Sequence, residues 1–186
     1  MIYSSALTTL TPISSPLIIR MKEHYVTLIR ENKLLTAIIS AIGATLCIWT
    51  LAAIDNSIDT PYVLIAPFGA TMVLIFGVHR SPLAQPKNVI FGHLITAAVG
   101  LFFINYIEVT PLTLGLAVGL GLFIMLMFDV THPPAGGNPL LIMLGGHTSW
   151  TFLLHPILIG TLGIVALAVL YHRFIPGHIY PYSEKK

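Results

Sequence analysis

Residues 129–139 read DVTHPPAGGNP and separate two apolar runs, 112–128 before them and 140–144 after them. Each proline lacks a backbone N–H donor and pushes the preceding residue out of the helical region, so the stretch cannot be helical throughout. We therefore expect a shaped loop that feeds a helix starting near Pro139. Its glycines leave backbone N–H groups unshielded and the helix start adds a partial positive charge, a combination that suits a small anion.

The chain around this loop is apolar enough for a membrane. Of its 186 residues 55% are hydrophobic and 9% are charged, whereas a soluble domain carries about 25% charged residues. An ordinary soluble fold and a disordered chain are therefore excluded. The sequence predicts an all-α polytopic fold of about six helical segments, one of them short or broken. The predicted segments are 34–53, 62–78, 88–106, 112–128, the short run 140–144, and 152–171.

Basic residues gather at alternate ends of these spans. They lie at 20–33, at 80–87 and at 173–186, whereas the turns at 55–61 and 107–111 contain none. Because cytoplasmic loops collect Lys and Arg, we expect both termini in the cytoplasm. That requires an even number of crossings, so the short run after the proline-rich loop must reach the far side of the membrane.

The chain divides into three parts. Residues 1–33 form a cytoplasmic tail, in which Met21, Tyr25 and Leu28 share one helical face and indicate an amphipathic helix at the membrane interface. Residues 34–173 form the transmembrane domain and 174–186 a second cytoplasmic tail. A short chain without a visible signal or transit peptide indicates a bacterial inner (plasma) membrane.

An internal repeat relates two loops. Shifting the chain against itself by 52 residues aligns 76–84 with 128–136, so that Phe, Val and Pro recur in register. Each unit is then a helix, a proline-rich loop and a second helix, and both loops face the same side. Corresponding broken segments in the two halves of a transporter point to its substrate site. Pro67 also breaks the second predicted span about a third of the way along.

Polar side chains in and beside these loops predict an anion site. An ionisable group inside a span costs about 2.5 to 3.5 kcal/mol and is a functional candidate by default. His93, about 8 Å into the third span, is the clearest case. The candidate substrate-binding residues are Arg80, Gln85, Asn88, His93, His132, Gly136, Gly137 and Asn138. The alternative is that both loops are only tight turns.

Proton coupling is assigned to Asp129, His93 and His132, and Asp129 is expected to pair with Arg80 or His132. Its alternative is an interfacial carboxylate hydrated by the cytoplasm. On the fourth span, Gly115 and Gly119 form a Gly-x-x-x-Gly pair, which favours close helix packing.

Several function classes find no support in the sequence. The eight histidines include no His-Glu-x-x-His motif and no close His pair with carboxylates, so we expect neither a metal site nor another cofactor. A net charge of +2 is too small for nucleic-acid binding. We therefore expect no enzyme, and keep an intramembrane His/Asp enzyme and a non-transporting membrane scaffold as alternatives.

Three motifs in this order resemble the HPP family of integral membrane proteins, named for its His-Pro-Pro motif. They are APFGAT at 66–71, RSPLAQPKN at 80–88 followed by Gly92-His93, and THPPAGGNP at 131–139. Members from cyanobacteria and chloroplasts are implicated in nitrite transport. The resemblance, over about 34–173, therefore implies a transporter of a small monovalent oxyanion, with nitrite as the first candidate. Lys87 stands where an Arg is common, which keeps the charge but loses the bidentate fork.

The small size of the domain bears on its assembly. Six spans in 186 residues leave little room for an enclosed pathway. We therefore expect a homo-oligomer in the lipid bilayer, and a dimer is the commonest closed choice.

Overall fold

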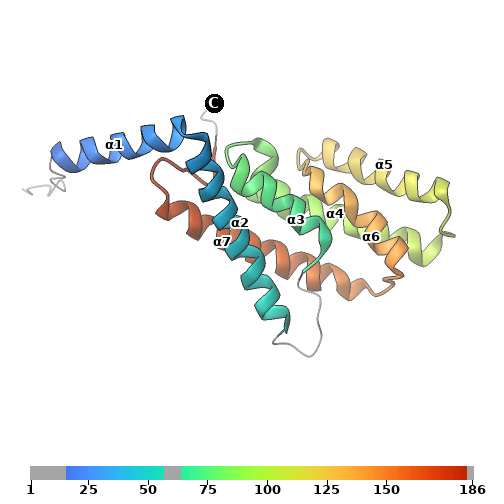
Figure 1. Cartoon of the computed structure of the whole chain (residues 1–186). Coiled ribbons are helices and arrows are strands. Elements are labelled where there is room, and N and C mark those ends of the chain that lie inside the picture. Colours follow the sequence, from blue (N-terminus) through green and yellow to red (C-terminus); the bar gives the residue numbers. More distant parts are fainter. Residues whose placement is uncertain (1–15, 57–63, 184–186) are drawn as a thin grey trace, which may run out of the picture.

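The computed structural model describes residues 16–56 and 64–183, and every regular element in them is helical (Figure 1). The prediction of an all-α fold is confirmed. The helices are α1 Pro16–Glu31, α2 Lys33–Asn56, α3 Ala66–Met72 continued by a π-helical turn Val73–Gly77, α4 Pro86–Tyr106, α5 Pro111–Met127, α6 Asn138–Gly145 and α7 Ile159–Phe174. Shorter 3-10 or π turns lie at Pro82–Ala84, Pro133–Gly137, Trp150–Leu153 and Leu154–Leu158.

Three stretches of helix among the described residues are long and apolar enough to cross a membrane: Lys33–Asp55, Pro86–Tyr106 and Trp150–Phe174. Ala66–Gly77 and Pro111–Met127 are apolar but shorter. The chain is therefore a membrane protein in which full-length spans alternate with shorter helices.

The second predicted span, 62–78, needs a correction. Its helix begins only at Ala66, and Pro67 lies in the first turn, where the missing N–H has no helical partner to lose. Pro67 therefore starts α3 rather than breaking it. Residues 57–63 lie outside the described part of the chain.

α4 is the central helix of the bundle. It packs against α5, α6 and α7. Half of the residues in its most apolar stretch are buried, compared with 17% in that of α2. Two glycines on its inner face let other backbone come close. A Cβ atom at Gly92 would lie 2.8 Å from the Cβ of His132, and one at Gly100 would lie 2.9 Å from the Cα of Pro139. The proline-rich loop therefore lies directly against α4.

The same contacts give the depth of that loop. Gly92 is about 9 Å and Gly100 about 21 Å from the start of α4, at 1.5 Å per residue. The chain between His132 and Pro139 thus descends along the inner part of the helix. Non-helical backbone is tolerated at such depth only where protein or water surrounds it. Here α4 and α3 surround it.

α6 is the short helix expected after the loop. It ends at Gly146, whose φ of 71° gives the left-handed cap that glycine adopts without strain. The irregular chain beyond it reaches the far end of α4, where Asn105 Nδ2 donates to the Thr148 carbonyl at 2.9 Å. The segment from α6 to Thr148 therefore extends to the end of α4 remote from the two proline-rich loops.

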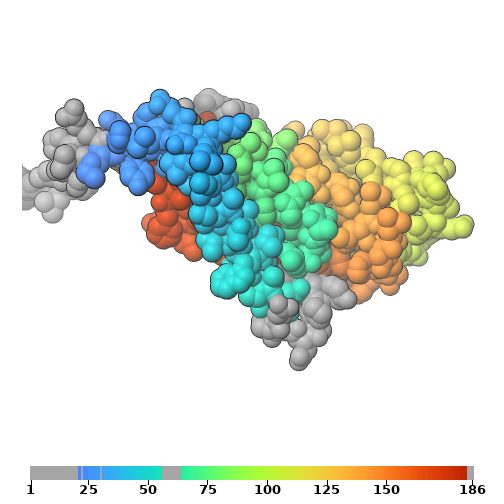
Figure 2. All heavy atoms as spheres, in the orientation of Figure 1, coloured from blue at the N-terminus to red at the C-terminus, as the bar shows by residue number. Residues whose placement is uncertain are grey.

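α1 projects from the bundle at a sharp angle to α2 (Figures 1 and 2), and Val26 of α1 lies against Gly177 of the C-terminal segment. Asn32 forms the corner, because its Oδ1 accepts a hydrogen bond from the Leu35 N–H and caps α2. Met21, Tyr25 and Leu28 remain exposed on α1. The helix expected in the N-terminal tail is present, and its place at the membrane interface stays a prediction.

The two loops of the predicted repeat have matching local structure. Each contains a 3-10 turn, Pro82–Ala84 in one and Pro133–Gly137 in the other. The helices that follow begin at Pro86 and Asn138, which keeps the 52-residue offset of the sequence alignment.

Candidate functional site

Five polar side chains with no exposed surface meet inside the bundle: Thr71, His93, Thr96, His132 and Asn138. They come from α3, from α4, from the loop after α5 and from the first residue of α6. The structure thus brings together three of the predicted site residues, His93, His132 and Asn138. We call these five side chains the histidine network.

One threonine hydroxyl joins the two histidines. Thr71 Oγ1 lies 3.1 Å from His93 Nε2 and 3.0 Å from His132 Nε2. The other nitrogen of His132 lies 2.8 Å from the Leu83 carbonyl, and Asn138 Nδ2 lies 3.0 Å from His93 Nδ1. The rings of His93 and His132 are 5.1 Å apart, centre to centre.

With both imidazole rings neutral, the donors and acceptors of these hydrogen bonds can be assigned. A carbonyl only accepts, so His132 Nδ1 carries the proton and its Nε2 accepts from the Thr71 hydroxyl. The Thr71 oxygen then accepts from His93 Nε2–H, and His93 Nδ1 accepts from Asn138. The result is a continuous hydrogen-bond chain from Asn138 to the Leu83 carbonyl, and such a chain can pass a proton between its two imidazoles.

Thr96 completes the inner end of the histidine network. Asn138 Nδ2 donates to Thr96 Oγ1 at 3.0 Å and to the His93 carbonyl at 3.1 Å, while the Thr96 hydroxyl donates to the Gly92 carbonyl at 2.9 Å. Sequence reasoning missed both Thr71 and Thr96. Two signals in the sequence point to them. Thr71 is the last residue of the APFGAT motif, and Thr96 lies one helical turn after Gly92 and His93.

The other polar residues predicted for the site lie elsewhere. Arg80 Nη2 donates to the Gly177 carbonyl at 3.1 Å, and its guanidinium lies 6.0 Å from the centre of the Tyr182 ring. Gln85 Nε2 donates to the His79 carbonyl at 2.9 Å, while its oxygen accepts from the Tyr182 N–H at 2.7 Å. Both therefore fasten the loop at 79–85 to the C-terminal segment.

Asn88 connects the two proline-rich loops. Its Nδ2 donates to the Thr131 carbonyl at 2.8 Å, so it holds the second loop against the start of α4. Gly136 and Gly137 are half-buried in the 3-10 turn that precedes α6. A Cβ atom at Gly137 would lie 3.6 Å from Pro67 Cγ, whereas one at Gly136 would meet nothing within 4 Å.

The expected pairing of Asp129 is wrong. The side chain is exposed at a residue with φ 53°, and no ion pair joins it to Arg80, both of which lie in the described part of the chain. His132 cannot be its partner because the Leu83 carbonyl and Thr71 occupy both ring nitrogens.

Gly115 and Gly119 lie on the outward face of α5, and a Cβ atom at either would meet nothing within 4 Å. They therefore pack against no other helix of the described chain, and the close helix packing predicted for them stays a prediction. Gly121 is the glycine of α5 that packs closely against α4, since its Cβ position lies 3.2 Å from Thr96 Cγ2.

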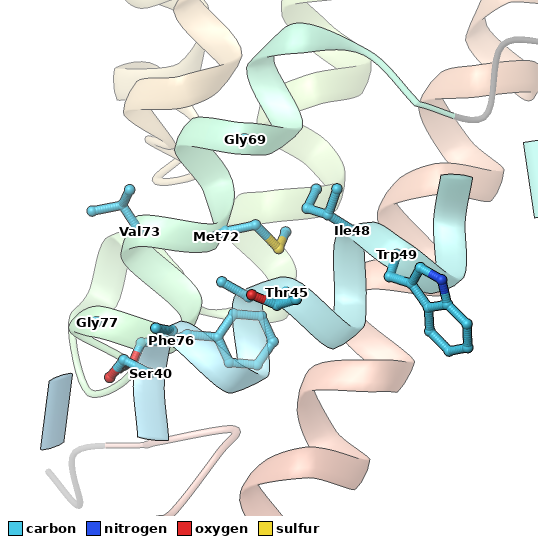
Figure 3. Close-up of a pocket in the computed structure, with 11 residues that line it drawn as sticks. Ser40, Thr45, Ile48, Trp49, Gly69, Met72, Val73, Phe76 and Gly77 are labelled. Carbon is cyan, nitrogen blue, oxygen red and sulfur yellow. Dashed lines mark hydrogen bonds between the residues drawn. The ribbon is translucent and has the colours of Figure 1, made fainter. Parts of the chain in front are cut away.

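A pocket among the described residues lies apart from the histidine network. It has a volume of about 710 Å³ and opens between α2 and α3, where Thr45, Ile48, Met72 and Phe76 line it (Figure 3). Its lining is almost wholly apolar. The pocket is therefore no anion site, and the histidine network is enclosed by the bundle.

Comparison with known proteins assigns the chain to a family. The model of the HPP family's transmembrane region matches residues 29–181, which include the histidine network and both proline-rich loops. Two transmembrane proteins of Dictyostelium discoideum are similar to the chain. One is 36% identical over 126 residues, which are 64% of this chain and 44% of that protein. The other is 32% identical over 127 residues, which are 63% and 40%.

The chain therefore spans less than half the length of these relatives. No solved structure matches it. Since the family model covers nearly the whole described bundle, from the end of α1 to the C-terminal segment, the chain belongs to the HPP family of membrane proteins.

Proposed function

We propose that the chain transports a small monovalent oxyanion across the membrane, with nitrite as the first candidate, and that the substrate passes the histidine network. The observation that carries this proposal is the complete burial of five polar side chains in a bundle with so few charged residues. Polar groups at membrane depth are costly and usually belong to substrate or proton pathways.

The donors of the histidine network suit an oxyanion. The Thr71 hydroxyl and the Asn138 amide each lie within hydrogen-bond distance of His93, at its Nε2 and its Nδ1. Oxyanions accept hydrogen bonds from hydroxyl, amide and imidazole groups without a metal ion. An anion that replaces the Thr71 hydroxyl between the two rings accepts from His93 Nε2–H, and from His132 Nε2 once that nitrogen is protonated.

Charge balance argues for coupling to a proton. Lys and Arg are absent from the histidine network, so an anion there lacks a permanent counter-ion. Protonation of His93 or His132 supplies one positive charge, since histidine changes its charge near neutral pH. We therefore expect nitrite and a proton to move in the same direction. Asp129, exposed at the loop, is proposed as the group that exchanges this proton with water.

Access requires the histidine network to open. Thr71 on α3 holds His93 and His132, which lie on α4 and on the second loop. A small displacement of α3 therefore separates both contacts while the helical hydrogen bonds of α4 stay intact. Such a movement opens the enclosed histidines, as entry of a substrate requires.

Uptake into proteoliposomes tests the function. With the full chain reconstituted, an inwardly directed proton gradient is expected to accelerate nitrite uptake, measured against nitrate, formate and chloride. No flux of any of these anions would overturn the transport proposal. Nitrite uptake at the same rate with and without the pH gradient would support transport and refute the proton coupling.

A threonine pair tests the site. Thr71→Val removes the hydroxyl that joins the histidines, whereas the control Thr50→Val removes one that bonds only the Leu46 carbonyl of its own helix. Loss of a buried hydrogen-bond partner costs about 1 to 3 kcal/mol. We expect Thr71→Val to lower the uptake rate about tenfold or more and the control to keep it. Equal uptake rates in the two variants, both folded, would show that the histidine network is not part of the substrate pathway.

Assembly and location extend the proposal. Gly115 and Gly119 on the outward face of α5 are available to a second copy, and we propose a homodimer in a bacterial inner membrane with both termini in the cytoplasm.

A further inference from the structure

A second group of histidines lies away from the histidine network, where the C-terminal segment meets the first proline-rich loop. His79 follows the π-helical turn after α3, His172 lies in the last turn of α7, and His178 lies in the C-terminal segment. One ring nitrogen from each lies within 4.8 Å of the other two. We call these residues the tail histidines.

Their hydrogen bonds turn a nitrogen lone pair of His172 toward the ring of His178. His172 Nε2 donates to the Ile75 carbonyl at 2.9 Å, so the Nδ1 of a neutral His172 carries a lone pair. That Nδ1 accepts from His178 Nδ1–H at 2.9 Å, and the proton of His178 must move to its Nε2 for a metal ion to replace it there. A histidine whose second nitrogen is held by a backbone carbonyl is the usual form of a metal ligand.

His79 supplies the strongest signal. Its Nε2 is buried and has no hydrogen-bond partner, the one such side-chain atom in the described residues. Its ring lies 4.3 Å from that of His178 and 4.8 Å from that of His172. A buried polar atom without a partner is rare in native proteins and calls for a missing water or ion.

The surroundings keep two of these rings neutral. Burial, followed by the nearby His178, His172 and Arg80, lowers the pKa of His79 to about 4. Burial also lowers the pKa of His178 to about 4, with His172 and Arg80 as the smaller causes. Neutral imidazole is the form that donates a lone pair to a metal.

We propose that His79, His172 and His178 bind one divalent transition-metal ion, with Zn²⁺ as the first candidate. Imidazole is a preferred ligand of zinc, and three histidines with a water or small anion in the fourth position make a complete tetrahedral site. At a Zn–N distance of about 2.0 to 2.1 Å, ligand nitrogens lie about 3.3 Å apart. The three nitrogens, which lie within 4.8 Å of one another, therefore need to approach by up to about 1.5 Å to bind one ion.

An entry route exists beside the site. A pocket of about 160 Å³ is lined by His79, Arg80 and His178, together with Val26 and Ile29 of α1. An ion reaches the tail histidines through it, and Arg80 favours an anion as the fourth ligand. The sequence spacing does not reveal this site, because its ligands come from three segments and no carboxylate belongs to it.

Bound metal joins α7 and the C-terminal segment to the first loop. Tyr180 already donates to the Ala84 carbonyl at 3.0 Å and Arg80 to the Gly177 carbonyl. The same loop carries the Leu83 carbonyl that accepts from His132. The ion is thus expected to fix the segment on which the histidine network ends. This inference does not depend on transport.

The test uses the full purified chain in detergent, after removal of any polyhistidine tag and of metal by a chelator. Zn²⁺ is titrated by calorimetry, and Co²⁺ reports the geometry through the visible absorption of its tetrahedral form. We expect one ion per chain, a tetrahedral Co²⁺ spectrum and a higher melting temperature with Zn²⁺.

Three variants decide the assignment. His79→Gln and His178→Gln are expected to weaken binding at least tenfold and to abolish the Co²⁺ spectrum. His24→Gln, at an exposed residue of α1, is expected to bind as the unaltered chain does. Folding is checked by helical circular dichroism in each case. The proposal is overturned if the unaltered chain binds neither ion, or if folded His79→Gln and His178→Gln bind both ions unchanged.

Discussion

At the scale of single residues, Gly92 decides whether His132 reaches the histidine network. Only a hydrogen occupies the Cβ position there, which lies 2.8 Å from His132 Cβ and 3.1 Å from the Val130 carbonyl oxygen. A larger side chain must push the loop away from α4. The hydrogen bond between His132 and Thr71 then lengthens or breaks.

Gly92→Ala is therefore expected to lower the free energy of unfolding by about 1 to 3 kcal/mol, as overpacking typically does. The matched control is Gly69→Ala in α3, since a Cβ atom there meets nothing within 4 Å. The control gains up to about 1 kcal/mol from helix propensity. Denaturation in mixed micelles measures both. Similar stabilities for the two variants would contradict the close approach of loop and helix.

The charged residues show how local roles can mislead. Arg80 was expected to bind substrate by full charge, yet it donates to the Gly177 carbonyl and lies against Tyr182. Inside the histidine network, hydroxyl, amide and imidazole groups form the hydrogen bonds. Uncharged donors cost less to bury than a guanidinium, which explains their use at this depth.

At the scale of elements, α1 and the loop before α6 depart most from simple spans. α6 is eight residues long. Its second residue, Pro139, lies beside Gly100, about 21 Å from the start of α4. Its loop is tolerated because α3 and α4 cover it. Hydropathy predicts the short length of α6, but the burial of its loop depends on helices distant in sequence.

α1 supports a prediction of its own. Met21 and Tyr25 are exposed on one face, while Glu23 and Thr27 lie on another. If α1 lies in the interface, spin labels at Met21→Cys and Tyr25→Cys collide with lipid-soluble oxygen, and labels at Glu23→Cys and Thr27→Cys collide with a water-soluble nickel complex. Electron paramagnetic resonance measures both collision rates. Equal accessibility of all four labels to the water-soluble complex would place α1 in solvent.

At the scale of the whole molecule, the polar loops separate into two groups. The first loop, the second loop and the C-terminal segment are joined by contacts of Lys87 with the Phe128 carbonyl and of Arg80 with the Gly177 carbonyl. Thr148 meets Asn105 at the other end of α4. Basic loops therefore share one end of the bundle, which is the arrangement that the positive-inside rule requires.

Single cysteines in a Cys47→Ala background test the orientation. Glu108 lies beyond the far end of α4 and Ser183 in the C-terminal segment, and both are exposed. A membrane-impermeant maleimide is expected to label Glu108→Cys in intact cells and to label Ser183→Cys only after permeabilisation. The reverse pattern would invert the topology, and labelling of both in intact cells would refute the even number of crossings.

The sequence by itself determined the class of this protein, the approximate helices, the short α6, the presence of His93 inside a span and that of His132 and Asn138 at a broken segment. Those properties depend on hydropathy, on proline chemistry and on spacing along the chain, all of which are local. Tertiary structure alone decided which side chains meet: Thr71 with two histidines, Arg80 with the C-terminal segment, and His79 with His172 and His178. Such partners are chosen by the packing of helices distant in sequence, where a glycine at one position, as at Gly92, sets which backbone can approach.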